Sequence, residues 1–429
     1  MHRLVILFFL VFGSATATAT ATAAASAEQP ALQRARTSLN AIGPELLTSR
    51  LRNNGVDNAM VSSPSLYFAL SVLALGADGA SQQLLRTLLL ADRDGAVADV
   101  AQPLAAQLSA DNSGGSMDAA FRMSHSLWST NGASREMPFV FAEEFLTVAA
   151  SMVGASHRQL DFREPGASRV INDWAEEKTR GLIPTVIDDG LLSTLDWVIL
   201  NTALFEGTWG TPMRRVGVED TYRFATLDGN RQAAETIRTV DYVARVVDLE
   251  DGSVAFQLPF AGGKYAFIVH LPASDQTDVR GWLLNEAVPG FAAMAARVSG
   301  GEGSLHQLLI QLPVFGFSDA VTMRGDSPMT QDLGLAPLFD SRADLSRLSE
   351  RSSRVAVIKQ DNRIELDEKG VRAAAATLIG GAVTTTVRPS HPRREIVVDR
   401  PFAFAIVERV SQALLFNGVL VSPPQRQAS

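Results

Sequence analysis

The spacing of apolar and polar positions predicts mainly helices in the first half of the chain. Residues 39–52 have a helical pattern, with Pro44 either in the first turns or at a break. Residues 63–77, SPSLYFALSVLALGA, form a nearly all-apolar helix that opens with Ser-Pro and belongs inside a large domain. Further helices are expected at residues 79–90, 97–110, 138–149 and 168–186.

Strands are predicted mostly after these helices, and they dominate the later part of the chain. Residues 121–130 alternate, and residues 193–209 have the continuous apolar centre of a buried strand. Further strands are expected throughout residues 236–272 and at 308–318 and 354–366, with a hairpin at 401–408 and 413–421. No repeat or linker interrupts this order, so the chain is predicted to be one large α+β domain.

The first residues have the pattern of an export signal. Arg3 precedes the apolar run Leu4 to Phe12, and Ala25-Ser26-Ala27 is a small-residue cleavage site. The alternative, a membrane anchor, is disfavoured because the apolar run is too short to span a bilayer. We therefore expect residues 1–27 to be a secretory signal, residues 28–429 to be the domain, and the protein to be secreted.

Composition excludes several kinds of chemistry. The chain has no cysteine, so disulfides and thiolate sites are excluded. Its net charge of −8 does not favour a nucleic-acid partner. None of its six histidines lies at metal-ligand spacing from another, and no nucleophile elbow or phosphate loop is found. An enzyme is not supported, and we expect neither metal nor cofactor.

The segment from Glu368 to Pro392, EKGVRAAAATLIGGAVTTTVRPSHP, is made mostly of small side chains. Alanine favours helices, so one interpretation is a short helix from Val371 to Ile379 leading into a disordered loop. The other is a strand that enters a sheet. Val371, Ala373, Ala375, Thr377 and Ile379 would then face one way, and Arg372 would lie on the face that can stay wet.

Motifs along the whole domain resemble those of the serpins, the serine protease inhibitor superfamily. They are NTALFEGTW at 201–209, SPSLYFALSVLALGA at 63–77, DLGLAPLFDSRADLS at 332–346, and RPFAFAIVE followed by ALLFNGVLVSP near the end. The resemblance implies about nine helices, three β-sheets with a large central mixed sheet, and an exposed reactive-centre loop at about residues 367–393.

The same resemblance implies a suicide-substrate inhibitor. A serine protease cleaves the loop and forms an acyl-enzyme, and the loop then inserts into the central sheet and distorts the protease. The alternative is a non-inhibitory serpin that acts as a binding or carrier protein or as a chaperone. No membrane partner is implied, and we expect a monomer.

The resemblance also assigns roles to particular residues. The expected sheet-opening region is Ser63, Ser65, Asn201, Trp209 and Gln360, where Gln360 replaces a histidine common in the family. The expected hinge is Glu368, Lys369, Gly370, Val371, Arg372, Ala373, Ala374, Ala375, Ala376 and Thr377. The family usually has Thr or Ser in place of Val371.

The cleaved bond is expected between Thr384 and Thr385, fourteen residues after Gly370, with Val383 as a neighbour. Small and β-branched residues suit the shallow pocket of elastase-like or subtilisin-like proteases. Arg388 would attract a trypsin-like enzyme, but Pro389 follows it and disfavours cleavage.

Overall fold

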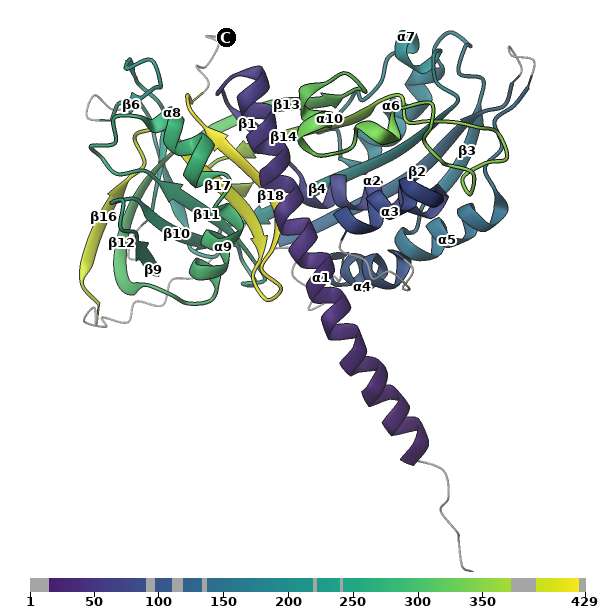
Figure 1. Ribbon diagram of the computed structural model, residues 1–429. Helices are drawn as coiled ribbons and strands as arrows, with labels where there is room; N and C mark the ends of the chain where they lie inside the picture. The colour runs from purple at the N-terminus through teal and green to yellow at the C-terminus, as the bar shows by residue number, and fades with distance from the viewer. Residues whose placement is uncertain are drawn as a thin grey trace, which may run out of the picture.

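The computed structural model describes residues 15–89, 97–109, 119–132, 137–218, 222–239, 242–371 and 391–423. Two large sheets lie side by side, and the long helix α1 runs between them (Figure 1). The α-helices among the described residues are α1 (Ala15–Asn54), α2 (Ser63–Gly76), α3 (Gly79–Leu88), α4 (Val97–Ser109), α5 (Glu143–Val153), α6 (Ala167–Lys178), α7 (Asp189–Leu192), α8 (Val279–Trp282), α9 (Phe291–Ser299) and α10 (Pro328–Asp332). Two further helical turns are η1 (Leu283–Ala287) and η2 (Ala336–Leu338).

The sheet that matters for function has six strands in the order β13-β14-β15-β4-β2-β3. Its strands are β2 (Ala119–Thr130), β3 (Ser156–Leu160), β4 (Trp197–Thr208), β13 (Phe315–Met323), β14 (Ile358–Leu366) and β15 (Gly370–Val371). β2 pairs with β3 in parallel and the other pairs are antiparallel, so the sheet is mixed, as expected.

The second sheet has ten strands, and a third has two. The ten are β1 (Ala59–Val61), β5 (Met213–Val216), β8 (Thr236–Thr239), β9 (Tyr242–Asp248), β10 (Val254–Pro259), β11 (Tyr265–Leu271), β12 (Ser304–Pro313), β16 (Arg393–Val397), β17 (Phe402–Glu408) and β18 (Ala413–Leu420). The two-stranded sheet pairs β6 (Phe224–Ala225) with β7 (Arg231–Gln232). The prediction of an α+β fold with three sheets is thus confirmed.

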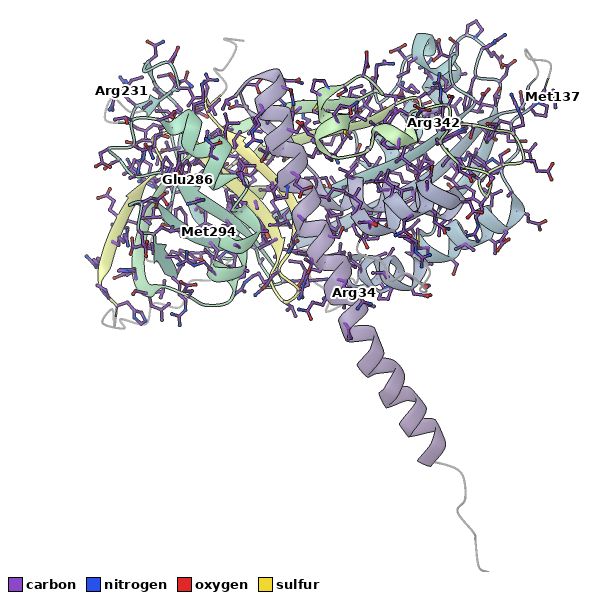
Figure 2. The ribbon with its side chains drawn as sticks, in the orientation of Figure 1. Arg34, Met137, Arg231, Glu286, Met294 and Arg342 are labelled. Carbon is purple, nitrogen blue, oxygen red and sulfur yellow. The ribbon has the colours of Figure 1, made fainter. Side chains whose placement is uncertain are left out.

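Helix α1 corrects the expectation for Pro44. The helix continues through Pro30 and Pro44, so Pro44 lies neither in the first turns nor at a break. Proline within a helix costs about 3 kcal/mol. Packing outweighs that cost here, because Leu39, Ile42 and Leu46 on the same helix are all buried in the main core. Arg34 marks the place where the free part of α1 leaves the body of the molecule (Figure 2). None of the described helices combines the length and apolarity needed to cross a bilayer.

The expected strand at residues 308–318 is two strands in different sheets. β12 ends at Pro313 in the ten-stranded sheet, and β13 begins at Phe315 in the six-stranded sheet. Val314 therefore carries the chain from one sheet to the other. The apolar pattern continues across it because residues on both sides contribute to the one core that the sheets share.

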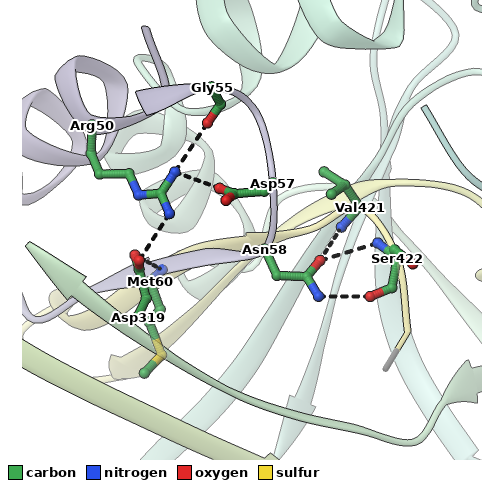
Figure 3. A network of polar contacts seen from close by, with 8 residues as sticks. All are labelled: Arg50, Gly55, Asp57, Asn58, Met60, Asp319, Val421 and Ser422. Carbon is green, nitrogen blue, oxygen red and sulfur yellow. Dashed lines mark hydrogen bonds and ion pairs between the residues drawn. The ribbon is translucent and has the colours of Figure 1, made fainter. Parts of the chain in front are cut away.

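A buried ion pair joins helix α1 to the six-stranded sheet, and its carboxylate also binds the ten-stranded sheet (Figure 3). The Arg50 guanidinium, at the end of α1, donates to the Asp319 carboxylate of β13 over 2.9 Å and also binds Asp57. The other carboxylate oxygen of Asp319 accepts from the backbone N–H of Met60 in β1 over 3.2 Å. Because both sides of this pair are buried, losing either partner would leave an uncompensated charge.

The continuous apolar centre of β4 predicted a strand in a buried sheet, and the structure buries only part of that strand. Phe205 and Leu204 are buried, whereas the stretch from Trp197 to Asn201 is only half-buried. The apolar sequence suits a strand with neighbours on both sides. In the structure the first half of β4 has β2 on one side and an open space on the other.

Candidate functional site

A slot between β4 and β14 is the main feature of the six-stranded sheet. No backbone ladder joins the two strands among the described residues, and β15 separates them at one end. Beyond β15, between the first halves of β4 and β14, lies a cavity of about 480 Å³. It is lined by residues 197–203 of β4, residues 358–363 of β14 and the side of α2. We call this space the strand slot, since its two long walls are strand edges.

The first residues of the expected hinge occupy one end of the strand slot, beside the last residues of β4 and β14. We call this the upper end of the slot. After β14 the chain turns at Asp367, whose N–H donates to the carbonyl of Gly370 over 3.0 Å. Gly370 and Val371 then form β15, opposite Thr208 and Gly207 of β4. Gly370 has a φ of 151°, and a Cβ there would lie 1.9 Å from the Gly207 carbonyl oxygen. Only glycine fits so close to the neighbouring backbone.

Trp209 fixes this turn in place. Its indole Nε1 donates to the Asp367 carbonyl over 2.8 Å, and its backbone N–H donates to the Lys369 carbonyl over 3.1 Å. The ring stacks on Phe260 with centroids 5.0 Å apart. The turn therefore rests on a buried aromatic pair, at the point where a strand entering the slot would begin.

An ion pair that the sequence did not reveal ties the hinge to the second sheet. Arg215 of β5 donates to the Glu368 carboxylate over 3.0 Å and to Glu235 over 2.5 Å. The three side chains are partly exposed, so this network contributes little to stability. Arg215 and Glu368 lie 153 residues apart in the chain, so no local pattern could have indicated their pairing.

Gln360 attaches β14 to the start of α2. Its Oε1 accepts from the Ser62 N–H over 2.9 Å, and its Nε2 donates to the Ser62 carbonyl over 2.8 Å. The same Oε1 accepts from Asn362 Nδ2 over 3.1 Å. Ser62 is the N-cap of α2, and its Oγ accepts from the N–H of Ser65. Gln360 thus forms hydrogen bonds with both the backbone N–H and the backbone carbonyl of Ser62, and neither bond involves an ionisable group.

Asn201, halfway along β4, contacts a histidine on β2. Its Nδ2 lies 3.2 Å from His125 Nδ1, and His125 also packs edge-on against Phe68. Burial lowers the pKa of His125 to about 4, so the ring is neutral at pH 7. Reasoning from the sequence missed His125, because only the pairing of β2 with β4 places it opposite Asn201.

The structure brings together only part of the predicted sheet-opening region. Ser63 bonds Asn417 of β18 over 3.2 Å, and Ser65 lines the strand slot with Asn201 and Gln360. Trp209 lies apart from these four, at the upper end. Of the expected hinge, Glu368, Lys369, Gly370 and Val371 lie within the described residues. The predicted hinge residues from Arg372 to Thr377 lie outside them, as do the residues predicted around the cleaved bond, Val383, Thr384, Thr385 and Arg388.

The described residues offer no alternative site of metal chemistry. No group of three or more histidine, aspartate or glutamate side chains among them is placed to hold an ion. His270 illustrates a structural histidine. Its Nε2 lies 3.1 Å from Ser253 Oγ in a fully buried position, and burial lowers its pKa to about 4.

Comparisons with known proteins agree with this geometry. The family described as "Serpin (serine protease inhibitor)" matches residues 37–423. Serpin-Z1B of Triticum aestivum is 27% identical over 399 residues, which cover 88% of this chain and 94% of that protein. The leukocyte elastase inhibitor of Sus scrofa is 26% identical and covers 88% and 97%.

A solved structure shows the same fold. The native state of the thermophilic serpin tengpin superposes with a TM-score of 0.71 at 21% identity, covering 90% of this chain and 93% of that one. Together with the family match over most of the chain, this means that the protein belongs to the serpin family, whose members are generally protease inhibitors rather than enzymes.

Proposed function

We propose that the protein is a suicide-substrate inhibitor of serine proteases that inserts its cleaved reactive loop into the strand slot. One observation carries the proposal. Gly370 and Val371 are already seated between β4 and β14, and the slot continues beyond them in the same direction. The next residues would lengthen an existing strand, without the cost of starting a new one.

The pairing of β15 fixes the register for the entering segment. Gly370 lies opposite Thr208 and Val371 opposite Gly207, so the numbers of paired residues add to 578. Continued along β4, this register sets residues 372–381 against residues 206–197, which is the remaining length of the strand. The single pair Leu366–Val371 gives the register on the β14 side, where paired numbers add to 737.

The two faces of the entering strand then follow from its neighbours. Val371 is buried, and Ala203 and Ile199 on the same face of β4 pack against the main core. Val198 and Leu200 on the opposite face pack against a second apolar cluster, which includes Ile171 and Trp174 of α6. Ala373, Ala375, Thr377 and Ile379 would share the core face with Val371, because residues directly opposite in a sheet point the same way. Their small size suits that already packed face.

Insertion would also bury the half-exposed part of β4. Trp197, Val198, Ile199 and Leu200 are partly exposed along the slot, and burying apolar surface yields about 25 cal/mol per Å². Backbone hydrogen bonds to both walls roughly offset the entropy lost in ordering the segment. We infer that this apolar burial supplies the net gain that drives insertion.

The target that best fits the loop is an elastase-like or subtilisin-like protease. Cleavage between Thr384 and Thr385 would leave residues 372–381 free to enter the slot. The pig relative is named as a leukocyte elastase inhibitor, which supports a small pocket without identifying the enzyme. We propose that the inhibitor acts as a monomer.

We also propose that the protein is exported after removal of residues 1–27. α1 runs through the expected cleavage site, and the first buried side chain described on it is Ala35. Removing residues 1–27 would therefore shorten the helix without taking a described contact from the core. N-terminal sequencing of protein recovered outside the cell should begin at Glu28. An intact Met1 there would contradict removal of residues 1–27, and recovery of the protein only inside the cell would contradict export.

The experiment for inhibition is incubation with an elastase-like or a subtilisin-like protease. An inhibitor gives a complex that survives denaturing electrophoresis, and mass spectrometry of the released C-terminal peptide locates the cleaved bond. A non-inhibitory serpin gives only a clipped chain. The cleaved protein should also melt at a much higher temperature than the intact one, and equal melting temperatures would refute insertion.

A further inference from the structure

Glu206 is a mostly buried carboxylate on β4, and only one of its two oxygens has hydrogen-bond partners among the described residues. Its side chain is 11% exposed, and its Oε2 accepts from Arg180 over 2.6 Å and from Arg122 over 3.4 Å. Its Oε1 is buried and has no hydrogen-bond partner among the described residues. Buried carboxylate oxygens normally accept a hydrogen bond, so we expect a hydrogen-bond donor for Oε1 of Glu206.

The register of β15 indicates where such a donor comes from. Val371 lies opposite Gly207, so a strand continued in this register would set Arg372 directly opposite Glu206. Its Cα lies 3.8 Å from that of Val371, whose placement is described, and an arginine side chain easily spans one strand spacing. On the other wall, the register with β14 sets Arg372 opposite Glu365.

Each of the two carboxylates, Glu206 and Glu365, has one oxygen that could accept a hydrogen bond from Arg372. Glu206 and Glu365 lie on the face of the sheet opposite the buried side chains of Phe205 and Ile364. The arginines at 122, 180 and 363 already bind these two carboxylates. The first two share Oε2 of Glu206, and Arg363 donates twice to Oε1 of Glu365. The second oxygen of each carboxylate is not used by these arginines.

We propose that Glu206, with Glu365 across the slot, is a binding site for the guanidinium of Arg372 in the inserted strand. The occupant follows from where the described chain ends and from the two carboxylate oxygens, Oε1 of Glu206 and Oε2 of Glu365, that the three arginines leave unused. This inference rests on the proposed insertion mechanism and adds a function to it. The ion pair holds the third residue of the entering strand opposite its partner, and so prevents the run of four alanines from slipping in register. Alanine side chains are too small and too similar to one another to fix the register by themselves.

The test is a double-mutant cycle in the full-length protein. Wild type, Arg372→Ala, Glu206→Gln and the double variant are cleaved in the reactive loop, and the rate of insertion is followed by tryptophan fluorescence. We expect each single variant to insert about two- to five-fold more slowly, as for a partly exposed charge pair, and the double variant to be no slower than the slower single one. Arg372→Lys should lie between wild type and Arg372→Ala, because lysine keeps the charge and loses the planar fork.

Two controls separate this inference from a loss of folding and from a failure of the mechanism. Glu302→Gln removes a comparable arginine pair, to Arg297 at 2.6 Å, far from the slot, and should leave the insertion rate unchanged. If wild type inserts and the two single effects multiply in the double variant, the binding site is refuted while the mechanism stands. If cleaved wild type gains no stability at all, both are refuted.

Discussion

The substitution Ala375→Glu is the sharpest test of the inserted register. In that register residue 375 lies between Ala203 of β4 and Asn362 of β14, on the face that packs against the core. Asn362 is 4% exposed. A glutamate side chain placed there would be buried without a cation opposite it, since the flanking pairs on that face are Phe205 with Ile364 and Asn201 with Gln360.

The size of the effect follows from the pKa of the carboxyl group. A buried glutamate avoids its charge by taking up a proton, which costs about 1.36 kcal/mol for each pH unit above its ordinary pKa of about 4.3. At pH 8 the cost is about 5 kcal/mol, and at pH 5 it is about 1 kcal/mol. Because the pKa is raised in the inserted state, the penalty is present at high pH and disappears as the pH falls.

Ala374→Glu is the matched control. In the inserted strand, residue 374 would lie on the opposite face, next to the exposed Arg363, where a carboxylate can stay ionised. The assay is the stoichiometry of inhibition at pH 8, with unfolding of the cleaved form in guanidinium at pH 8 and pH 5. We expect Ala375→Glu to behave as a substrate and to recover most of its cleaved-state stability at pH 5, and Ala374→Glu to inhibit nearly as wild type. Equal behaviour of the two variants would show that the assumed alternation of faces is wrong.

Three further predictions concern the intact protein. Gln360→Ala leaves the Ser62 N–H without its partner and leaves the Ser62 carbonyl with only the 3.4 Å bond from the Leu66 N–H. An unsatisfied group costs about 1–3 kcal/mol, so the intact form should melt at a temperature a few degrees lower and convert faster to an inserted form on storage, as native electrophoresis would reveal. Trp209→Phe removes the indole bond to Asp367 and keeps the stacking, so its chemical unfolding should show a loss of about 1 kcal/mol; an unchanged midpoint would contradict the role given to that bond. Burial lowers the pKa of His125 to about 4, so its contribution to stability is complete above its unfolded pKa of about 6.5 and is lost as the pH falls toward 4. His125→Asn should flatten this part of the stability–pH curve by up to about 3 kcal/mol. An unaltered slope would refute the assignment.

The sequence predicted the parts of the site that depend on local pattern. The bend Glu368-Lys369-Gly370 after the strand ending at Leu366 is where it was expected, and Val371 continues as a strand, which favours the strand interpretation over the helical one at that residue. Motif order indicated the family. It could not indicate the ion pairs of Arg215, or that His125 would face Asn201, because those contacts join residues that only the sheet brings together.

Pro44 and the half-buried part of β4 show where local pattern misleads. The chain around Pro44 contains a helix breaker, yet the helix continues because burial of its apolar face outweighs a cost of about 3 kcal/mol. The apolar run in β4 reads as a buried strand, and half of it is uncovered because its neighbour is missing on one side. Apolar periodicity reports which surfaces a chain can bury, not whether they are buried in the state at hand.

By itself, the sequence determined the class of fold, the family and the segment that could become a strand, since these depend on side-chain size and alternation along the chain. Only the tertiary structure decided that β14 and β4 stand apart, that Gly370 and Val371 already lie between them, and which residue would meet Glu206. The reason is physical. Strand register is a relation between two segments about 160 residues apart along the chain, and it is set by packing and backbone hydrogen bonds that neither segment contains alone.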